Sequence, residues 1–259
     1  MKSNLRKVLT IFVLVAVAFS SLQAQESSEP TTPKKKCDLN IVVGADIMSR
    51  YIWRGTDYGD SPSFQPTLAL TINNFEIGCW SAIATNNNYK EIDIYAKYTL
   101  KKFSITLTDY YIPFANGVSS SPDNRYFIYG NKKTAHTLEA SLQYKAGEKF
   151  PLWVTGGVFF YGNDKRWGYD AGKDSTERTY YSSYVEVGYT FTKKENSADV
   201  FVGFTPTAGA YGSKLGFVNI GVTGSKKIKI TDEFSLPVKA SLIFNPQTSA
   251  AHFAFGISL

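Results

Sequence analysis

The sequence predicts an all-β fold, namely a transmembrane antiparallel up-and-down β-barrel of about twelve strands. Three observations lead there: segments that alternate polar and apolar residues, the lack of a long apolar run after the N-terminal one, and an aromatic content of 15% that is mostly Tyr and Phe. Alternate residues of a strand point to opposite faces. Tyr and Phe favour strands and bilayer interfaces.

The N-terminus has the features of a secretory signal peptide. Lys2, Arg6 and Lys7 precede an apolar run over 8–19, and small residues lead to a plausible cleavage point after Ala24. Residues 25–37 contain two prolines and a lysine run without apolar periodicity, which predicts a disordered periplasmic leader. Cys37 lies too far from the apolar run for a lipoprotein. The predicted organisation is therefore 1–24 signal peptide, 25–37 leader and 38–259 barrel.

The charge of the mature chain is modest. Removing residues 1–24 takes away three basic residues and no acid, so the formal charge falls from +6 to +3 (6 − 3). The remaining lysines are spread over apparent turns, which does not indicate a partner nucleic acid. No phosphate-binding glycine loop or zinc spacing is present, and no cofactor is expected.

Alternating segments separated by turn signals define the candidate strands. They are 40–53, 64–73, 75–85, 90–100, 103–113, 134–145, 151–161, 179–192, 198–205, 216–225, 234–244 and 250–259. Every second connection is short, while the long ones, 115–133, 162–178 and 205–215, all fall in the other set. Bacterial outer-membrane barrels have even strand numbers, short periplasmic turns and long outer loops, with both termini in the periplasm.

The faces of the strands fit lipid outside and water inside. In residues 91–100, EIDIYAKYTL, the acids and Lys97 share one face and the aliphatic residues share the other. The last segment, AHFAFGISL, places Phe253, Phe255, Ile257 and Leu259 on one face, as barrels that end on an apolar strand do. Aromatic residues near strand ends predict two interfacial girdles. The outer girdle would hold Tyr51, Trp53, Tyr110, Tyr111, Phe159 to Tyr161, Tyr180 and Tyr181, and the periplasmic girdle Phe75, Phe103, Phe150, Trp153, Phe191 and Phe234.

Residues 44–100 carry a family resemblance. The segments SRYIWRG (49–55), Ser61-Pro62 with Gln65, GCWSA (78–82) and EIDIYAKY (91–98) are similar to the opening of the TorF-like porins, a bacterial family also named for a Gly-Cys-Trp motif. SSYVEVGYTF (182–191) is a weaker match. The resemblance implies an outer-membrane barrel with a transport role and brings no substrate with it.

Charged residues on the predicted inner faces are the candidate site. The lumen-lining candidates are Asp46, Arg50, Glu76, Glu91, Asp93, Lys97, Glu139, Glu186 and Lys239. Two possibilities stay open: these charges line a polar, somewhat acidic passage, or they pair across a narrow lumen and plug it. Arg54 and Gly55 are expected to turn the chain at the outer rim.

Other chemistry is weakly indicated. Cys37 and Cys79 are expected to be free, since one precedes the first strand and the other lies on a lipid face. An outer-membrane phospholipase needs a serine activated by histidine, and neither His136 nor His252 has a suitable neighbouring motif. Asp164, Asp170, Asp174 and Glu177 miss the EF-hand calcium spacing. No catalytic or metal residue is assigned.

The functional expectation is a porin-like channel in the cell outer membrane, through which small hydrophilic solutes diffuse passively. The partners would be outer-membrane lipid and the solute, with a homo-oligomer possible. The alternative is a surface adhesion or interaction barrel with a closed lumen, which would use the loops 115–133 and 162–178.

Overall fold

The computed structural model describes residues 38–113, 125–130, 134–164 and 179–259. The predicted signal peptide, the leader and Cys37 lie outside these residues, as do most of the two long loops. The described residues form strands and turns without a helix. In this part of the chain no helix has the length and hydropathy needed to cross a membrane.

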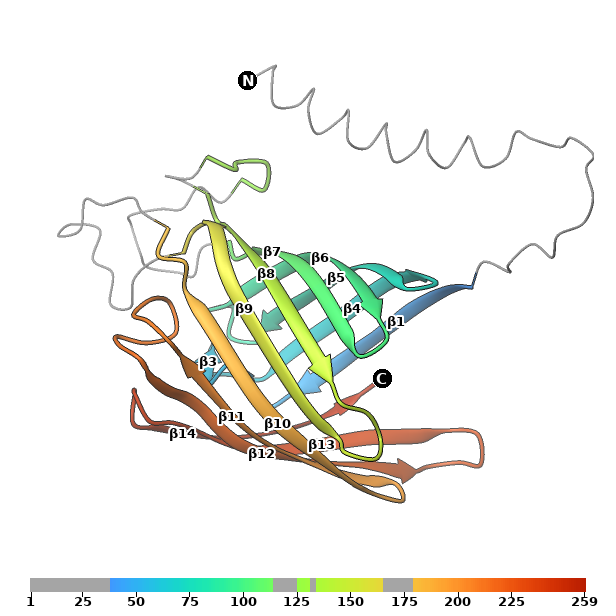
Figure 1. Cartoon of the computed structure of the whole chain (residues 1–259). Coiled ribbons are helices and arrows are strands. Elements are labelled where there is room, and N and C mark those ends of the chain that lie inside the picture. The colour runs from blue at the N-terminus through green and yellow to red at the C-terminus, as the bar shows by residue number, and fades with distance from the viewer. Residues whose placement is uncertain (1–37, 114–124, 131–133, 165–178) are drawn as a thin grey trace, which may run out of the picture. The chain divides into compact units, whose positions relative to one another are not determined.

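Twelve antiparallel strands close into one barrel, in which sequence neighbours are also spatial neighbours and β14 meets β1 (Figure 1). This confirms the predicted strand number and up-and-down topology. The barrel strands are β1 (Leu39–Met48), β4 (Ser63–Ile72), β5 (Phe75–Ala84), β6 (Lys90–Leu100), β7 (Phe103–Tyr111), β8 (His136–Lys145), β9 (Leu152–Gly162), β10 (Ser183–Lys193), β11 (Asn196–Thr205), β12 (Gly216–Lys229), β13 (Ser235–Asn245) and β14 (Ala250–Ser258).

The two ends of the barrel differ in the length of their connections. At one end, the turn end, strands are joined by residues 73–74, 101–102, 146–151, 194–195 and 230–234. The opposite end, the loop end, carries 49–62, 85–89, 112–135, 163–182, 206–215 and 246–249. The predicted alternation of short and long connections is therefore confirmed.

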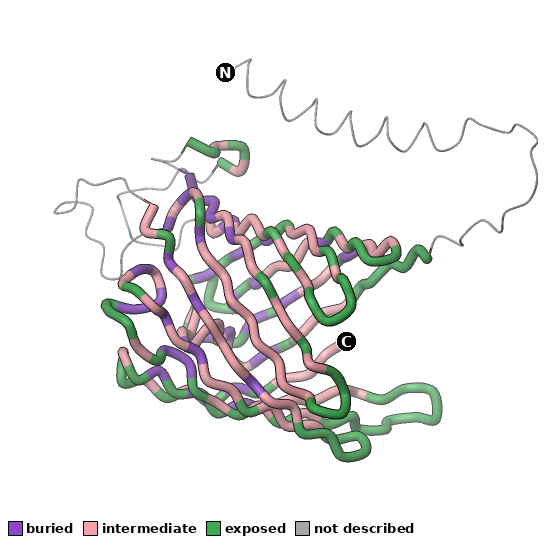
Figure 2. Tube along the Cα trace, in the orientation of Figure 1, coloured by how far each residue is buried: buried purple, intermediate pink, exposed green. Residues whose placement is uncertain are grey.

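Buried, intermediate and exposed residues are mixed along the barrel strands (Figure 2), and on β6 burial alternates from residue to residue at the loop end. On β6, Glu91 and Asp93 are buried, whereas Ile92 and Ile94 between them are 39% and 43% exposed. Since successive side chains of a strand point to opposite faces, the acids face the interior and the isoleucines face outward. β6 thus contributes a polar inner row at this end and an apolar outer row.

The first strand is shorter than predicted. β1 ends at Met48, and Ser49 binds the backbone of Phe255 on β14 through its own N–H, at 2.7 Å, and its hydroxyl, at 2.9 Å. The chain then leaves the barrel wall and forms a hairpin from β2 (Tyr51–Trp53) and β3 (Thr56–Tyr58). The continuous strand 40–53 was therefore wrong.

Several aromatic residues assigned to the interfacial girdles also lie elsewhere. Tyr51 and Trp53 belong to the hairpin and pack on other interior rings. Tyr110 and Phe159 contact Trp53 from β7 and β9, and Trp153 lines an interior cavity. Tyr51 and Trp53 follow the alternation of β1, but their apolar neighbours are interior rings and not lipid. Tyr110, Phe159 and Trp153 lie on the inner faces that the alternation of their strands gives them, so their assignment to the girdles was wrong.

Candidate functional site

The hairpin of β2 and β3, residues 51–58, enters the barrel interior and is the main feature of the candidate site. Its two-residue turn is Arg54-Gly55, with φ of 48° and 80°. Positive φ at both turn positions belongs to the tight turn that matches strand twist. The Gly55 carbonyl accepts a hydrogen bond of 3.1 Å from Asn245 on β13. A Cβ at Gly55 would lie 1.8 Å from the carbonyl oxygen of Val218 on β12, so only glycine fits.

Arg54 joins the tip of this hairpin to the opposite wall. Its Nη1 and Nη2 atoms donate to the two carboxylate oxygens of Glu139 on β8, at 2.7 and 3.1 Å. Nη1 also donates to the hydroxyl of Tyr211. The guanidinium lies 4.3 Å from the ring centre of Trp53 and 4.7 Å from that of Tyr184. A buried arginine with a bidentate carboxylate and aromatic faces is held in one position. Arg54 and Gly55 turn the chain as expected, but they do so inside the barrel and not at its outer rim.

Aromatic rings fill the space between the hairpin and the wall. Trp53 contacts Tyr110, Phe159 and Tyr211, with ring centres 5.4 to 6.5 Å apart. Farther from the tip, on the same face of β2, Tyr51 contacts Trp80 at 5.2 Å. These contacts come from β5, β7, β9 and the β11–β12 connection, while Gly55 lies against β12 and β13. The hairpin therefore spans the interior and narrows it near the loop end.

Interior cavities remain on both sides of the hairpin. One of about 570 Å³ opens at the turn end and is lined by Lys145, Glu148, Glu186 and Asp199 among others. A second, of about 450 Å³, continues to the hairpin and is lined by Arg50, Arg54 and Lys239. Thr155 and Glu186 line both cavities. A third, of about 150 Å³, lies at the loop end beyond Trp53.

The structure pairs most of the predicted lumen-lining charges. Lys239 binds Asp46 at 2.6 Å, Lys97 binds Glu76 at 3.1 Å, and Arg50 binds Asp57 at 2.8 Å as well as Asp60. Arg50 is in the segment that leads into the hairpin, not on the first strand as predicted. Asp57, Asp60 and the aromatic partners Tyr184 and Tyr211 were not among the candidates.

Two of the other predicted acids, Glu91 and Glu186, bind neutral donors. Glu91 accepts from the hydroxyl of Tyr89 at 3.0 Å, and Asp93 is its neighbour on the inner face of β6. Glu186 accepts from the hydroxyl of Tyr184 and, at 2.6 Å, from the amide of Asn219. The sequence does carry a signal for the missed hairpin, since an X-Gly pair between short aromatic segments, here Trp53-Arg54-Gly55-Thr56, is typical of a two-residue turn.

His136 takes part in a cluster on the outward face near the loop end. Its Nδ1 lies 2.8 Å from Asp109 Oδ1, its Nε2 lies 2.5 Å from the backbone oxygen of Tyr126, and Tyr129 stacks on its ring. Both ring nitrogens therefore meet acceptors, which leaves neither of them for the activation of a serine. His136 holds segment 125–130 against the barrel wall.

Of the four predicted loop acids, the structure describes one, Asp164. Asp164 is buried and accepts from the backbone N–H of Ser182 at 3.1 Å and from its hydroxyl. Burial raises the pKa of the Asp164 carboxyl, while the hydrogen bonds of Ser182 act against that change. Asp170, Asp174 and Glu177 lie outside the described residues. Within the described part, no three His, Cys, Asp or Glu side chains gather as a metal site would need.

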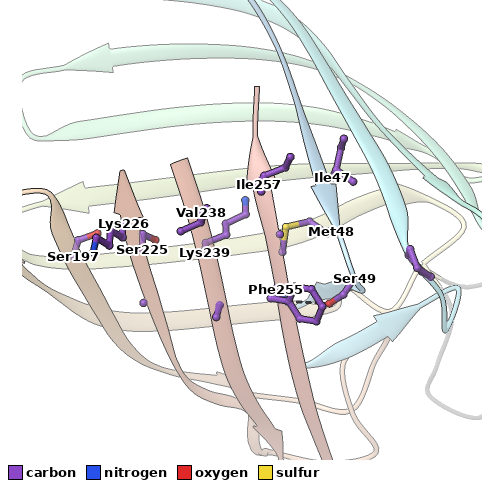
Figure 3. Close-up of a pocket in the computed structure, with 14 residues that line it drawn as sticks. Ile47, Met48, Ser49, Ser197, Ser225, Lys226, Val238, Lys239, Phe255 and Ile257 are labelled. Carbon is purple, nitrogen blue, oxygen red and sulfur yellow. Dashed lines mark hydrogen bonds between the residues drawn. The ribbon is translucent and has the colours of Figure 1, made fainter. Parts of the chain in front are cut away.

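Outside the barrel, a groove of about 850 Å³ follows the junction of β14 and β1 (Figure 3). Ile47, Val238, Phe255 and Ile257 line it with outward-facing apolar side chains. Cys79 also lies on an outward face, paired across strands with Leu68 and Ile94, and has no disulfide partner in the described chain. Neither feature adds polar chemistry to the interior site.

The fold and site define a class: a closed, twelve-stranded antiparallel barrel with a polar interior, narrowed by its own hairpin. No family model matches the chain, and no curated protein does. Among solved structures it is similar to BamA from Haemophilus ducreyi lacking POTRA domains 1-3, with 13% sequence identity and a TM-score of 0.39. The match covers 89% of this chain and 48% of that one, so this chain spans about half its length.

Proposed function

We propose that the barrel lies in the bacterial outer membrane and lets small hydrophilic solutes diffuse through its interior, past the constriction made by residues 51–58. The observation that carries this proposal is the pair of joined polar cavities, of about 570 and 450 Å³, which lead from the turn end to the hairpin. A polar, water-accessible interior is what passive diffusion of hydrophilic solutes needs.

The membrane location is supported by the outward face. Large apolar side chains are exposed on strands all round the barrel, among them Ile77, Leu107, Val200 and Phe253, at 46%, 53%, 48% and 63%. Soluble monomers rarely expose a continuous apolar surface of this extent, whereas a barrel in lipid requires one. The resemblance to TorF-like porins stays a prediction that agrees with this proposal.

The orientation follows the pattern of outer-membrane barrels, with the turn end and both termini in the periplasm. Single cysteines placed at Asn87 in the loop end and at Lys101 in the turn end would test it in a Cys37→Ser, Cys79→Ser background. A membrane-impermeant maleimide applied to intact cells should label Asn87→Cys and spare Lys101→Cys. The reverse labelling would contradict the orientation.

Conductance in planar bilayers tests the transport proposal. The refolded wild type should give small single-channel steps, and Gly55→Ala should give larger ones, because a Cβ at Gly55 collides with the Val218 backbone and displaces the hairpin. The matched control is Gly224→Ala on β12, where a Cβ meets no atom within 4 Å. If neither the wild type nor Gly55→Ala passes current, the channel proposal fails.

The second candidate, a closed barrel that acts through its surface loops, is favoured by the bidentate Arg54–Glu139 contact that holds the constriction in place. This candidate predicts that the protein gives no conductance in planar bilayers and that its loop end binds a partner. A catalytic role is not proposed, and a phospholipid hydrolysis assay on the refolded barrel should give no activity that His136→Ala or His252→Ala removes.

A further inference from the structure

The charges of the barrel interior are not balanced. Four cations point into its middle, and each is paired with an acid: Arg50 with Asp57 and Asp60, Arg54 with Glu139, Lys97 with Glu76, and Lys239 with Asp46. The contacts with Asp57, Glu139, Glu76 and Asp46 are 2.6 to 3.1 Å long. Two opposite charges at such a distance largely cancel in their effect on a passing ion.

Four further acids on the inner face have no cation partner among the described residues. Glu91, Glu186 and Asp199 are bound by hydroxyl or amide groups, from Tyr89, from Tyr184 and Asn219, and from Thr190 at 2.6 Å. Asp93 is buried beside Glu91, and its Oδ1 atom has no hydrogen-bond partner. Neutral donors satisfy the hydrogen bonding of Glu186 and Asp199 without adding a positive charge. Glu91 and Asp93 hydrogen-bond to each other, which requires that they share a proton.

Two of these acids lie directly on the solvent-accessible path. Glu186 and Asp199 line the cavity at the turn end, and Glu186 also lines the one that continues to the hairpin. The turn-end cavity has Lys145 as its basic residue, against Glu148, Glu186 and Asp199. The wall of the turn-end cavity is therefore negative. In the next cavity Arg50, Arg54 and Lys239 are each paired with an acid, and Glu186 has no cation partner among the described residues.

We propose that the interior is selective for cations, so that the solutes it passes are small hydrophilic cations, either inorganic ions or protonated amines. This inference rests on the proposed channel function and specifies its substrate class. Low-dielectric walls around a lumen focus the field of uncompensated charges and concentrate counter-ions there. The screening length at physiological salt, about 8 Å, is comparable with the distance across such a cavity, so screening does not remove the effect.

The reversal potential of the refolded protein in a KCl gradient measures this selectivity. The wild type should prefer K⁺ to Cl⁻. The double variant Glu186→Gln, Asp199→Asn keeps the size and hydrogen-bonding shape of both side chains and should lose most of the preference. Asp232→Asn is the matched control, because it also removes one acid but lies in the exposed β12–β13 turn beside Lys229. It should leave the reversal potential unchanged.

The outcomes separate this inference from the function on which it rests. No conductance in the wild type and in Gly55→Ala would overturn both the channel proposal and its selectivity. Conductance with a preference for Cl⁻, or a cation preference that the double variant leaves intact, would keep the channel and overturn the assignment of Glu186 and Asp199. A preference reduced in the double variant and intact in Asp232→Asn supports it.

Discussion

At the scale of single residues, the ion pair of Arg54 with Glu139 holds the hairpin in the barrel interior. Its side chain is 12% exposed, and that of Glu139 is 2% exposed, so neither charge is well hydrated. Removal of one partner of a buried ion pair leaves the other charged and unpaired, at a cost of about 3 to 5 kcal/mol. Glu139 would keep the hydroxyl of Tyr110, at 2.6 Å, as a neutral donor.

Arg54→Ala should therefore lower the free energy of unfolding by about 3 kcal/mol, the low end of that cost, because Tyr110 still binds Glu139. Urea unfolding of the barrel in lipid vesicles measures the change. The double variant Arg54→Ala, Glu139→Gln removes the orphaned charge and should recover part of the loss. Arg54→Lys keeps the charge but loses the bidentate contact, so its free energy of unfolding should lie between those of the wild type and Arg54→Ala. A double variant as unstable as the sum of both single variants would contradict a direct coupling of Arg54 and Glu139.

At the scale of elements, the alternation of polar and apolar residues predicts the strands well, because each strand has a wet face and an apolar face. The observed bounds of β6, Lys90–Leu100, are the ones predicted, and β4, β5 and β13 shift by one residue at one or both ends. For residues 51–58 the same alternation predicts the wrong surroundings. Tyr51 and Trp53 continue the parity of β1, yet their apolar surroundings are the aromatic rings of the interior.

For the candidate site, the sequence predicts which side chains face the interior but not which of them contact each other. Strand parity places Glu91, Glu139 and Glu186 on inner faces without knowledge of their partners. The partner of Glu139 is 85 positions away in the sequence and reaches it only because the hairpin folds inward. That event depends on the close approach of Gly55 to β12 and on Tyr211, in the β11–β12 connection, neither of which local periodicity reports.

The two faces of β7 allow a direct test of the outer surroundings. Leu107 faces outward and is 53% exposed, while Thr106 beside it faces inward. A lysine on the lipid face near the bilayer midplane costs about 2 to 4 kcal/mol. Leu107→Lys should therefore lower the folded fraction in lipid vesicles, measured by the heat-dependent mobility shift on gels, and Thr106→Lys should have little effect. Equal effects of both variants would argue against lipid as the neighbour of the outer face.

At the scale of the whole molecule, the barrel is closed at a short junction. β1 pairs with β14 at Asp46, Ile47 and Met48, three positions, whereas it pairs with β4 at ten. Backbone hydrogen bonds of 2.8 and 3.2 Å between Ala45 and Leu259 extend the junction at one side. Since an up-and-down barrel has no other covalent or sheet contact between its first and last strands, these few hydrogen bonds complete the ring.

Gly256 lies within this junction and lets the strands approach. A Cβ there would be 2.3 Å from the carbonyl oxygen of Ile47 and 2.4 Å from the sulfur of Met48. The sulfur can move, but the backbone oxygen belongs to the sheet. Gly256→Ala should therefore separate β14 from β1, so that their amides exchange hydrogen faster than in the wild type while β12 and β13, paired at ten positions, keep their protection. Gly224→Ala controls for the loss of a glycine in a strand. If Gly256→Ala left the exchange of β1 and β14 unchanged, the junction would not be the weakest pairing of the barrel.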